Sequence, residues 1–388
     1  MKEANRTEEM QMFLLCQAEG IGGKTLRKLL ERFGSADAVF RAGKSAWEEV
    51  LTKQQCGALS ALCGKGEAER RYREFARTGL SFVPFTSPAY PARLKEIPDP
   101  PKALYVRGRL PSEDVPSVAV VGARICSEYG RYMARQFGTE LAQAGIQVIS
   151  GMALGVDGIA QKAALMAGGA SCAVLGCGAD VCYPPENREL YDRLCAEGGI
   201  LSEYPPGTQP QRHLFPPRNR IISGLADAVL VVEARRKSGT LITVDMALEQ
   251  GKDVYALPGR ATDRLSDGCN ELLKQGAMIA TSAADIIENF FRIGTEVKSR
   301  KERKDEENET GSLERDGRGN AHFALPQQER EIMDALDITP RAVADVEEIL
   351  RSRGRRIPPQ ELMCRLVELS LKGLVEQEGA FFALPLSS

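Results

Sequence analysis

The sequence lacks several features that would assign it to other classes of protein. No apolar run approaches about 18 residues, so a transmembrane helix is not expected. The amino terminus, MKEANRTEEM, lacks the charged and then apolar plan of a secretory signal. Ten cysteines include no C-x-x-C pair and the chain has two histidines, which argues against zinc sites and disulfides. We therefore expect reduced thiols in a cytoplasmic protein with no metal or cofactor.

The charge balance is also close to neutral. A net charge of −2 excludes a uniformly basic nucleic-acid-binding surface but permits a local basic patch.

At 388 residues the chain exceeds one ordinary domain core, and its patterns predict four regions. Apolar residues at helical spacing predict a helical domain over 1–78, of the helix-hairpin-helix or SAM-like kind. Region 79–292 opens with a proline-rich connector and continues with strands and helices in alternation. Residues 293–325 are charged with almost no apolar content, which predicts a flexible linker. Three helices, around 328–336, 342–352 and 359–371, and a terminal β-ribbon predict a winged-helix domain over 326–388.

Two of these regions leave their role open. Gly20–Thr25 does not match a P-loop, because Ala18 stands at the first required glycine and a helix precedes it. The turn fits either a helix-hairpin-helix that touches a nucleic-acid backbone or a plain connection in a helical bundle. Residues 326–388 contain more acidic than basic side chains, which favours a protein-contact module over DNA binding.

From residue 117 onward, buried strands alternate with helices. Such repeats predict an α/β fold, a Rossmann-like doubly wound parallel sheet, which the connector strand 103–106 could extend. Glycines directly after three of the strands place flexible backbone at their carboxyl ends, where sheets of this kind bind ligands.

Residues 212–240 are the most informative stretch. The apolar run Ala228–Val232 is a predicted strand, and no acidic residue occurs from Tyr204 to Leu225. Basic residues precede and follow the strand, and Ser238-Gly239-Thr240 forms a small flexible turn after it. This combination is suited to a ligand that carries phosphates.

Catalytic and dinucleotide-binding interpretations fit less well. The first turn, starting at Gly122, is not G-x-G-x-x-G, and no acid ends the second strand to hold a ribose. His213 has no paired acid or cysteine near it in the sequence. Asp157 and Glu233 could act as bases, but a helix-start carboxylate and an ion pair with a crevice arginine are the simpler expectations.

The remaining interpretation is a basic crevice for several successive phosphates, as in single-stranded nucleic acid. Phe215 is the main candidate for stacking on a base. The crevice is predicted from three arginines, two lysines and three glycine amides: Arg124, Arg218, Arg220, Lys162, Lys237, Gly122, Gly151 and Gly239.

Motifs along residues 118–280 resemble the DNA-processing protein A family, also called DprA or Smf. They are VVGAR at 120–124, SEYG at 127–130, SGMALGVD at 150–157, LGCG at 175–178, YPPEN at 183–187, SEYPP at 202–206, FPPRNRIISG at 215–224, SGTLIT at 238–243 and ALPG at 256–259.

The resemblance implies a protein that binds single-stranded DNA, forms a homodimer, and loads the RecA recombinase in natural transformation or homologous recombination, without catalytic turnover. It implies DNA contacts at Gly122, Arg124, Ser127, Arg218, Asn219, Arg220, Ser238 and Gly239, with Lys162 a weaker candidate. Two departures from the family pattern reduce the positive charge expected in the crevice: many members have arginine at the position of Leu154 and histidine near Gln161.

The alternative function is a nucleotide-processing hydrolase of the lysine-decarboxylase-like type. Ser238–Thr240 faintly resembles the glycine-rich turn of those hydrolases. The expected dimer surface is an edge strand at 276–280 with the helix before it.

Overall fold

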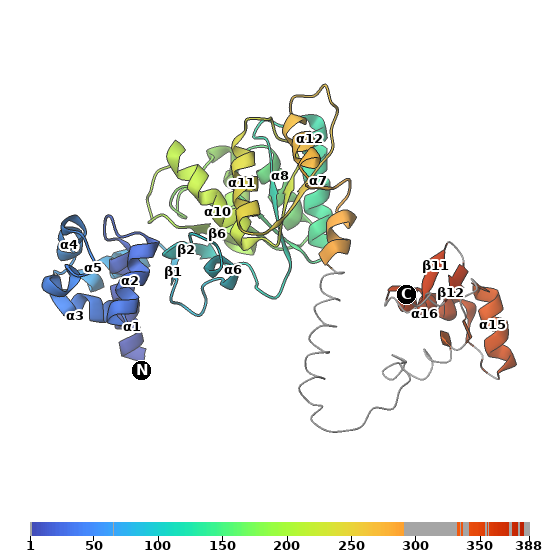
Figure 1. The fold of residues 1–388 in the computed structure, drawn as a ribbon, viewed down its shortest axis with the longest axis horizontal. Helices are drawn as coiled ribbons and strands as arrows, with labels where there is room; N and C mark the ends of the chain where they lie inside the picture. The colour runs from blue at the N-terminus through green and yellow to red at the C-terminus, as the bar shows by residue number, and fades with distance from the viewer. Residues whose placement is uncertain are drawn as a thin grey trace. The chain divides into compact units, whose positions relative to one another are not determined.

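The computed structural model describes residues 2–64, 66–290, 332–333, 335–336, 341–353, 355, 357–371, 375–378 and 381–383. The chain divides into two compact units, residues 1–302 and 303–388 (Figure 1). The predicted linker at 293–325 lies outside the described residues.

Five helices form the amino-terminal part of the first unit, as the apolar spacing predicts. They are α1 (Lys2–Cys16), α2 (Gly23–Phe33), α3 (Ala36–Trp47), α4 (Lys53–Ser60) and α5 (Glu67–Ala76). Side-chain caps fix where α3 and α4 begin: Ser35 accepts from the Ala38 N–H at 3.1 Å and Thr52 from that of Gln55 at 3.3 Å. Phe13 joins these helices to the sheet, because its ring lies 5.2 Å from Phe82 and 6.4 Å from Tyr105.

The turn between α1 and α2 packs against the connector rather than standing free. Lys102 Nζ donates to the carbonyls of Cys16 at 2.8 Å and Ile21 at 2.7 Å. A side chain at Gly23 would lie 3.3 Å from the Pro100 carbonyl oxygen. Lys102 thus holds this turn against the α/β domain, and whether the turn touches a nucleic acid stays a prediction.

A nine-stranded sheet is the centre of the first unit, with strand order β1-β2-β6-β5-β4-β3-β7-β8-β9. The connector supplies β1 and β2, which pair with each other in antiparallel fashion, and β2 also pairs antiparallel with β6; the remaining pairs are parallel. The strands are β1 (Ser81–Pro84), β2 (Ala103–Gly108), β3 (Ser117–Val121), β4 (Gln147–Ser150), β5 (Ser171–Val174), β6 (Gly199–Ser202), β7 (Ala228–Val231), β8 (Asp253–Ala256) and β9 (Met278–Ile279). The predicted Rossmann-like, mostly parallel sheet is therefore confirmed.

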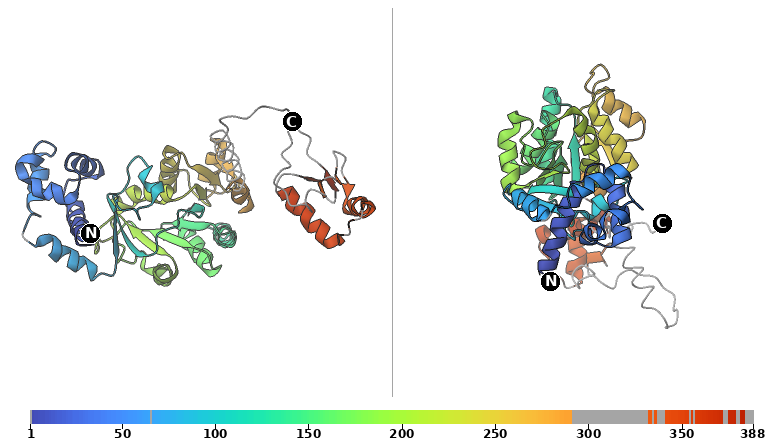
Figure 2. Two further views of the ribbon diagram at one scale, coloured as in Figure 1. Left: turned by 90° about the horizontal axis from the view of Figure 1, so that it is seen from below. Right: turned by 90° about the vertical axis from the view of Figure 1, so that its left-hand side faces the viewer.

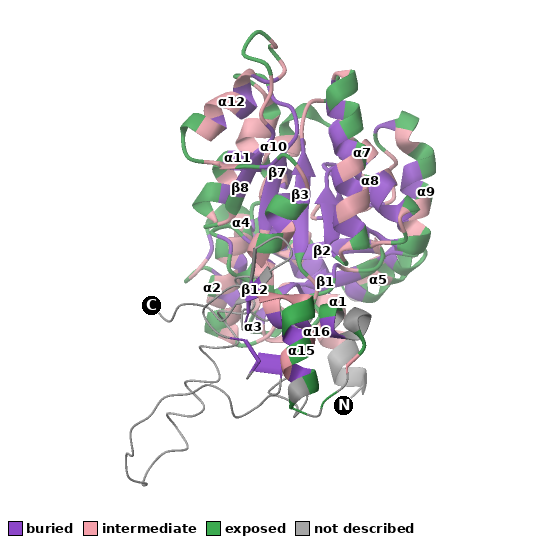
Figure 3. Ribbon diagram, turned by 90° about the vertical axis from the view of Figure 1, so that its right-hand side faces the viewer, coloured by how far each residue is buried: buried purple, intermediate pink, exposed green. Residues whose placement is uncertain are grey.

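Helices cover both faces of this sheet (Figures 2 and 3). On one face α7 (Glu128–Gln143) and α8 (Val156–Met166) share a core with β3, β4 and β7. A side chain at Gly138 would lie 2.3 Å from the Ala160 carbonyl oxygen, so glycine is what lets these two helices approach. On the other face lie α6 (Ala92–Lys95), α10 (Phe215–Leu225), α11 (Gly239–Glu249) and α12 (Asp267–Lys274), while α9 (Arg188–Glu197) packs beside β6.

Helix α10 was not anticipated from the sequence, which suggested only a basic segment before β7. Pro216 and Pro217 stand in its first turn, where a missing N–H costs nothing because no intrahelical partner exists there.

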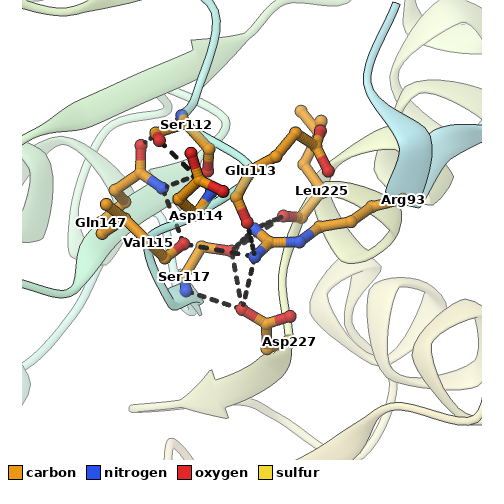
Figure 4. A network of polar contacts seen from close by, with 9 residues as sticks. All are labelled: Arg93, Ser112, Glu113, Asp114, Val115, Ser117, Gln147, Leu225 and Asp227. Carbon is orange, nitrogen blue, oxygen red and sulfur yellow. Dashed lines mark hydrogen bonds and ion pairs between the residues drawn. The ribbon is translucent and has the colours of Figure 1, made fainter.

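A polar network closes the end of the sheet opposite the carboxyl ends of β3 and β7 (Figure 4). Arg93 donates to Ser117 Oγ at 2.8 Å and lies 3.3 Å from Asp227 Oδ2. Gln147 bonds in both directions with the Ser112 backbone, at 2.8 and 2.9 Å. The network fixes the connector to the starts of β3, β4 and β7.

The second unit contains α15 (Val343–Ser352), α16 (Pro359–Leu371) and an antiparallel sheet of β10 (Arg341–Ala342), β12 (Phe381–Ala383) and β11 (Glu376–Glu378) in that order. Buried residues such as Leu350, Leu366 and Phe382 form its own core. The expected helices at 342–352 and 359–371 are present, whereas most of the expected helix at 328–336 lies outside the described residues. The winged-helix assignment stays a prediction.

Candidate nucleic-acid interface

A cavity of about 750 Å³ opens at the carboxyl ends of β3 and β7. From β3 the strand order runs to β4, β5 and β6 on one side and to β7, β8 and β9 on the other. The cavity therefore lies at the topological switch point, the usual ligand site of doubly wound sheets. We call it the crevice. Its lining comes from the turn after β3, the start of α8, the start of α10, and the loop between β7 and α11.

Arg218 is a fixed positive charge in the crevice wall. Its side chain is buried, and Nη1 donates to the carbonyl oxygens of Gly151, at 3.1 Å, and of Val174. Burial lowers the pKa of Arg218 to about 10, against the nearby charge of Asp157. The guanidinium is thus still ionised at neutral pH and has no freedom to move away.

Gly151 and Asp157 shape the pocket that holds this arginine. A side chain at Gly151 would meet the Arg218 guanidinium at 2.7 Å, so only glycine fits there. Asp157 lies in the first turn of α8 and accepts from the Gly151 N–H at 3.2 Å. Burial raises the pKa of Asp157, while the charge of Arg218 acts against that rise. The helix-start position expected for Asp157 is thus confirmed.

Phe215 lies among two arginines and a second ring. The guanidinium carbon of Arg124 is 5.6 Å from the Phe215 ring centre, and that of Arg218 is 6.0 Å away. The ring of Tyr183 is 5.6 Å from that of Phe215, with 30° between their planes. Arg124 is exposed, so this cluster presents a solvent-accessible cation and two rings at the crevice mouth.

The start of α11 provides the opposite wall. Ser238 is the residue before α11, and its Oγ is buried without a hydrogen-bond partner in the described part of the chain. Thr240 Oγ1 donates to the Gly122 carbonyl oxygen at 3.2 Å and so ties this helix start to the turn after β3. Unpaired amides and the helix dipole make this wall suitable for an anion.

The structure gathers most of the predicted residues and separates the others. Gly122, Arg124, Arg218, Asn219, Ser238 and Gly239 line the crevice. Gly151 lines a neighbouring cavity of about 70 Å³, which also contains Arg124 and Arg218. Among the described residues that line these two cavities, Ser127, Lys162, Arg220 and Lys237 do not appear.

Arg220 points away because it lies two residues after Arg218, about 200° around the helix. Its two terminal nitrogens bind both oxygens of Glu203, at 2.8 and 2.7 Å, and its Nε donates to the Asp99 carbonyl at 2.8 Å. The geometry therefore does not support the prediction that Arg220 contributes to the crevice. Arg220 instead anchors α10 to the end of β6 and to the connector.

Ser127 and Glu233 form a structural pair. Ser127 is the cap of α7 and accepts from the Gly130 N–H at 3.1 Å. The Ser127 N–H donates to Glu233 Oε2 at 2.9 Å, and the Ser127 hydroxyl donates to Oε1. The expected ion pair of Glu233 with a crevice arginine is wrong, because this buried carboxylate is bound by Ser127 instead.

Lys162 pairs with Glu189 at 2.9 Å on the outer surface, and Lys237 is exposed beside the crevice. The family departures also have defined positions. Leu154 lines the smaller cavity, whereas Gln161 is fully buried, accepting from the Met152 N–H at 3.0 Å and donating to the Cys172 carbonyl at 2.9 Å. Leu154 therefore places no charge at the smaller cavity, and Gln161 ties the turn after β4 to β5.

Three charged or aromatic residues that line the crevice were not among the predicted site residues: Arg212, Arg235 and Tyr183. Arg212 and Arg235 belong to the basic stretch already noted, and their charge was the available signal. Tyr183 follows β5 in the motif YPPEN, and an aromatic residue after a strand end was its only signal.

A second large cavity, about 1230 Å³, lies between the helical part and residues 204–206. Its cations already have partners: Arg70 and Arg71 both bind Glu67, whose pKa their hydrogen bonds lower to about 2. Lys102 is engaged with two carbonyls. We therefore place the candidate site in the crevice.

The fold and the crevice define a Rossmann-like protein with an anion-binding site at its switch point. Residues 81–291 match the model of the family described as DNA recombination-mediator protein A, and the chain belongs to that family. The resemblance seen in the sequence motifs is thus confirmed.

Named relatives agree with this assignment. The chain is 35% identical to protein Smf of Synechocystis over 297 residues, 74% of each chain. It is 45% identical to DNA processing protein DprA of Streptococcus pneumoniae over 201 residues, 52% of this chain and 71% of the relative.

Two solved structures are also similar. The X-ray structure of DprA from S. pneumoniae has a TM-score of 0.58 at 34% identity and covers 72% of this chain and 97% of its own. A structure concerning the single-stranded DNA binding mode of DNA processing protein A from Helicobacter pylori has a TM-score of 0.50 at 32% identity, covering 55% and 98%.

No helix among the described residues is both long and apolar enough to cross a membrane. Within the same residues no group of three histidine, cysteine or acidic side chains could hold a metal ion.

Proposed function

We propose that this protein binds single-stranded DNA in the crevice between β3 and β7 and passes the strand to the RecA recombinase in the cytoplasm. The observation that carries the proposal is the ionised, buried Arg218, held beside the Arg124–Phe215 stack and facing the start of α11. Family membership and the H. pylori relative, whose structure concerns single-stranded DNA, support it.

The shape of the site favours a single strand over a duplex. Phe215 is half-buried between Tyr183 and two guanidinium groups, so a base must leave its own stack to reach the ring. The cations around the ring would contact phosphates and not base edges, which gives affinity with little sequence preference.

The proposed activity is binding without turnover. Glu233, the better-placed carboxylate of the hydrolase alternative, is engaged by Ser127 and does not line the crevice among the described residues. Asp157 lines the crevice but is held by the Gly151 N–H beside Arg218. Neither carboxylate is placed to activate a water molecule against a bound nucleotide.

The test is a gel-shift titration of the full chain with single-stranded and double-stranded oligonucleotides of equal length, combined with an assay for base or phosphate release from mononucleotides. We expect a clear preference for the single strand and no release. Release that is abolished by Glu233→Gln would instead establish the hydrolase. Equal affinity for both DNA forms would contradict the proposed site.

Dimerisation and RecA loading extend the proposal. In the described part of the chain β9 is one of the two edge strands of the sheet, opposite β1, and Ile279 on it is 57% exposed. An unpaired edge with an exposed apolar side chain favours pairing with a second copy. A RecA ATPase assay on single-stranded DNA, with and without this protein, tests the loading step: faster onset is the expected result.

A further inference from the structure

Two loops beside the crevice carry exposed positive charge that the crevice itself does not use. Arg235, Arg236 and Lys237 follow β7, and Arg260 and Arg264 lie between β8 and α12. We call these five residues the basic rim. All five are exposed, and Figure 3 shows exposed loop residues next to α12.

The two loops form one surface. The Ala234 N–H donates to the Leu265 carbonyl at 2.9 Å, and the Gly268 N–H donates to the Ala234 carbonyl at 2.8 Å. Asn270 closes the second loop by bonding to the Gly259 backbone in both directions, at 3.2 and 3.0 Å. The β8–α12 loop is thus held at both of its ends, and backbone bonds at Ala234 join it to the β7–α11 loop.

This surface is continuous with the crevice. Arg235 and Leu265, one from each loop, line the crevice wall. A strand that leaves the crevice on the side of β7 and β8 must therefore pass over the basic rim.

The charges of the rim are mostly unpaired. Arg236 binds Glu271 at 3.2 Å, but Arg235, Lys237, Arg260 and Arg264 have no ion-pair partner among the described residues. Two carboxylates lie beside the basic rim: Asp263, whose Oδ1 accepts from the Leu265 N–H at 2.9 Å, and Asp267 in the first turn of α12. Five cations against Asp263, Asp267 and Glu271 leave this edge net positive.

The other side of the crevice is different. There Lys162 pairs with Glu189 at 2.9 Å, Arg188 with Asp192 at 3.0 Å and Arg193 with Glu197 at 2.8 Å. A phosphate backbone gains little on that side, because each cation already has its carboxylate.

We propose that the basic rim is a second phosphate-contacting surface, which guides the DNA strand out of the crevice over the β7–α11 and β8–α12 loops. The inference rests on the proposed function, since it needs a strand in the crevice. It adds a direction: the strand leaves toward α12 and not toward α9. It also predicts that long oligonucleotides gain affinity from residues that short ones never reach.

The test compares the full chain with the double variant Arg260→Glu/Arg264→Glu, using oligonucleotides of about six and about thirty nucleotides. The matched control is Lys95→Glu/Arg135→Glu, which makes the same charge change at exposed positions on α6 and α7. Anisotropy titrations at several salt concentrations are the measurement, and thermal melting checks that each variant is folded.

We expect the rim variant to bind the longer oligonucleotide at least tenfold more weakly, with a salt slope lower by about 0.7 for each lost phosphate contact. Its affinity for the short oligonucleotide should stay within threefold of the wild type, and the control should follow the wild type with both.

A rim variant that behaves like the control overturns the inference. An equal loss with both oligonucleotides also overturns it, because that result would place Arg260 and Arg264 at the crevice itself. A wild-type chain that binds neither oligonucleotide would instead refute the proposed function.

Discussion

Arg218 and Arg220 show how two residues of one motif acquire different roles. Both belong to the run FPPRNR, and both are cations on the same helix. Arg218 faces the crevice and donates to carbonyl oxygens, whereas Arg220 forms ion pairs with Glu203 and Asp99. Substitutions in this motif should therefore separate DNA binding from stability.

Arg124→Ala should weaken binding of single-stranded DNA about tenfold at moderate salt, because an exposed cation and its stack on Phe215 are lost. Arg220→Ala should leave affinity within about twofold but lower the melting temperature, since it leaves the carboxylate of Glu203 half-buried and unpaired. Gel-shift titration and thermal melting of both variants check this pair. The opposite pattern would move the site to the outer face of α10.

Arg218→Met should destabilise the fold by about 3 kcal/mol, because the carbonyl oxygens of Gly151 and Val174 lose their donor and Asp157 loses a compensating charge. The loss should depend on pH. Burial already raises the pKa of Asp157 in the folded state, and removing Arg218 raises that pKa further.

A raised pKa means that the folded protein holds this proton more tightly than the unfolded chain. The stabilisation is complete below the unfolded value of about 3.9 and is lost as the pH rises through the folded value. As the pH rises above the unfolded value, the variant should therefore fall further below the wild type in melting temperature. Arg188→Met, at an exposed pair with Asp192, is the control and should show no such divergence.

At the scale of elements, α7 and α8 decide where the crevice turns lie, because both helices begin at its edge. Their close contact depends on Gly138, which faces the Ala160 carbonyl oxygen. Close-packed interiors transmit such a change to the helix starts.

Gly138→Ala should lower stability by about 2 kcal/mol, although alanine is the better helix former by about 1 kcal/mol. Gly57→Ala is the matched control on α4: a side chain there meets nothing within 4 Å, so the same change should be neutral or stabilising. Thermal melting distinguishes the two. Equal behaviour of both variants would show that the α7–α8 contact carries no packing constraint.

For the whole molecule, the residues that line the crevice all belong to the first of the two units, residues 1–302. Each unit has its own buried core. Removing residues 303–388 should therefore keep affinity for single-stranded DNA within about threefold and leave the crevice intact. A gel shift with single- and double-stranded DNA checks this, and a tenfold loss would assign DNA binding to the second unit.

The proposed dimer is also a property of the whole molecule. Ile279→Lys at the β9 edge should shift the chain from dimer to monomer, since a charged residue on a sheet edge opposes strand pairing. Sedimentation velocity measures the change, with Leu248→Lys, at an exposed position on α11, as the control. An unchanged dimer in the Ile279 variant would place the interface elsewhere.

Local pattern was enough to predict the parallel strands from β3 onward, most of the helices between them and the glycine turns, because apolar period and turn residues act over a few positions. It did not predict β1, α6 or α10. It also gave the motifs that carry the family resemblance, and with them six of the crevice residues. It could not tell Arg218 from Arg220, because a helix turns by about 100° per residue and only packing says which face meets the crevice.

Tertiary structure alone decided which charges are available. Ser127 is 106 positions from Glu233, yet the two side chains bind each other and take a carboxylate and a hydroxyl out of the site. The ring of Tyr183 lies beside that of Phe215, and Arg235 and Leu265 line the same crevice. No spacing in the sequence encodes these arrangements. The sequence by itself therefore determined the kind of fold and the presence of a basic crevice. The packing of distant segments decided which cations face a ligand, since a charge is available only where no carboxylate has already been folded against it.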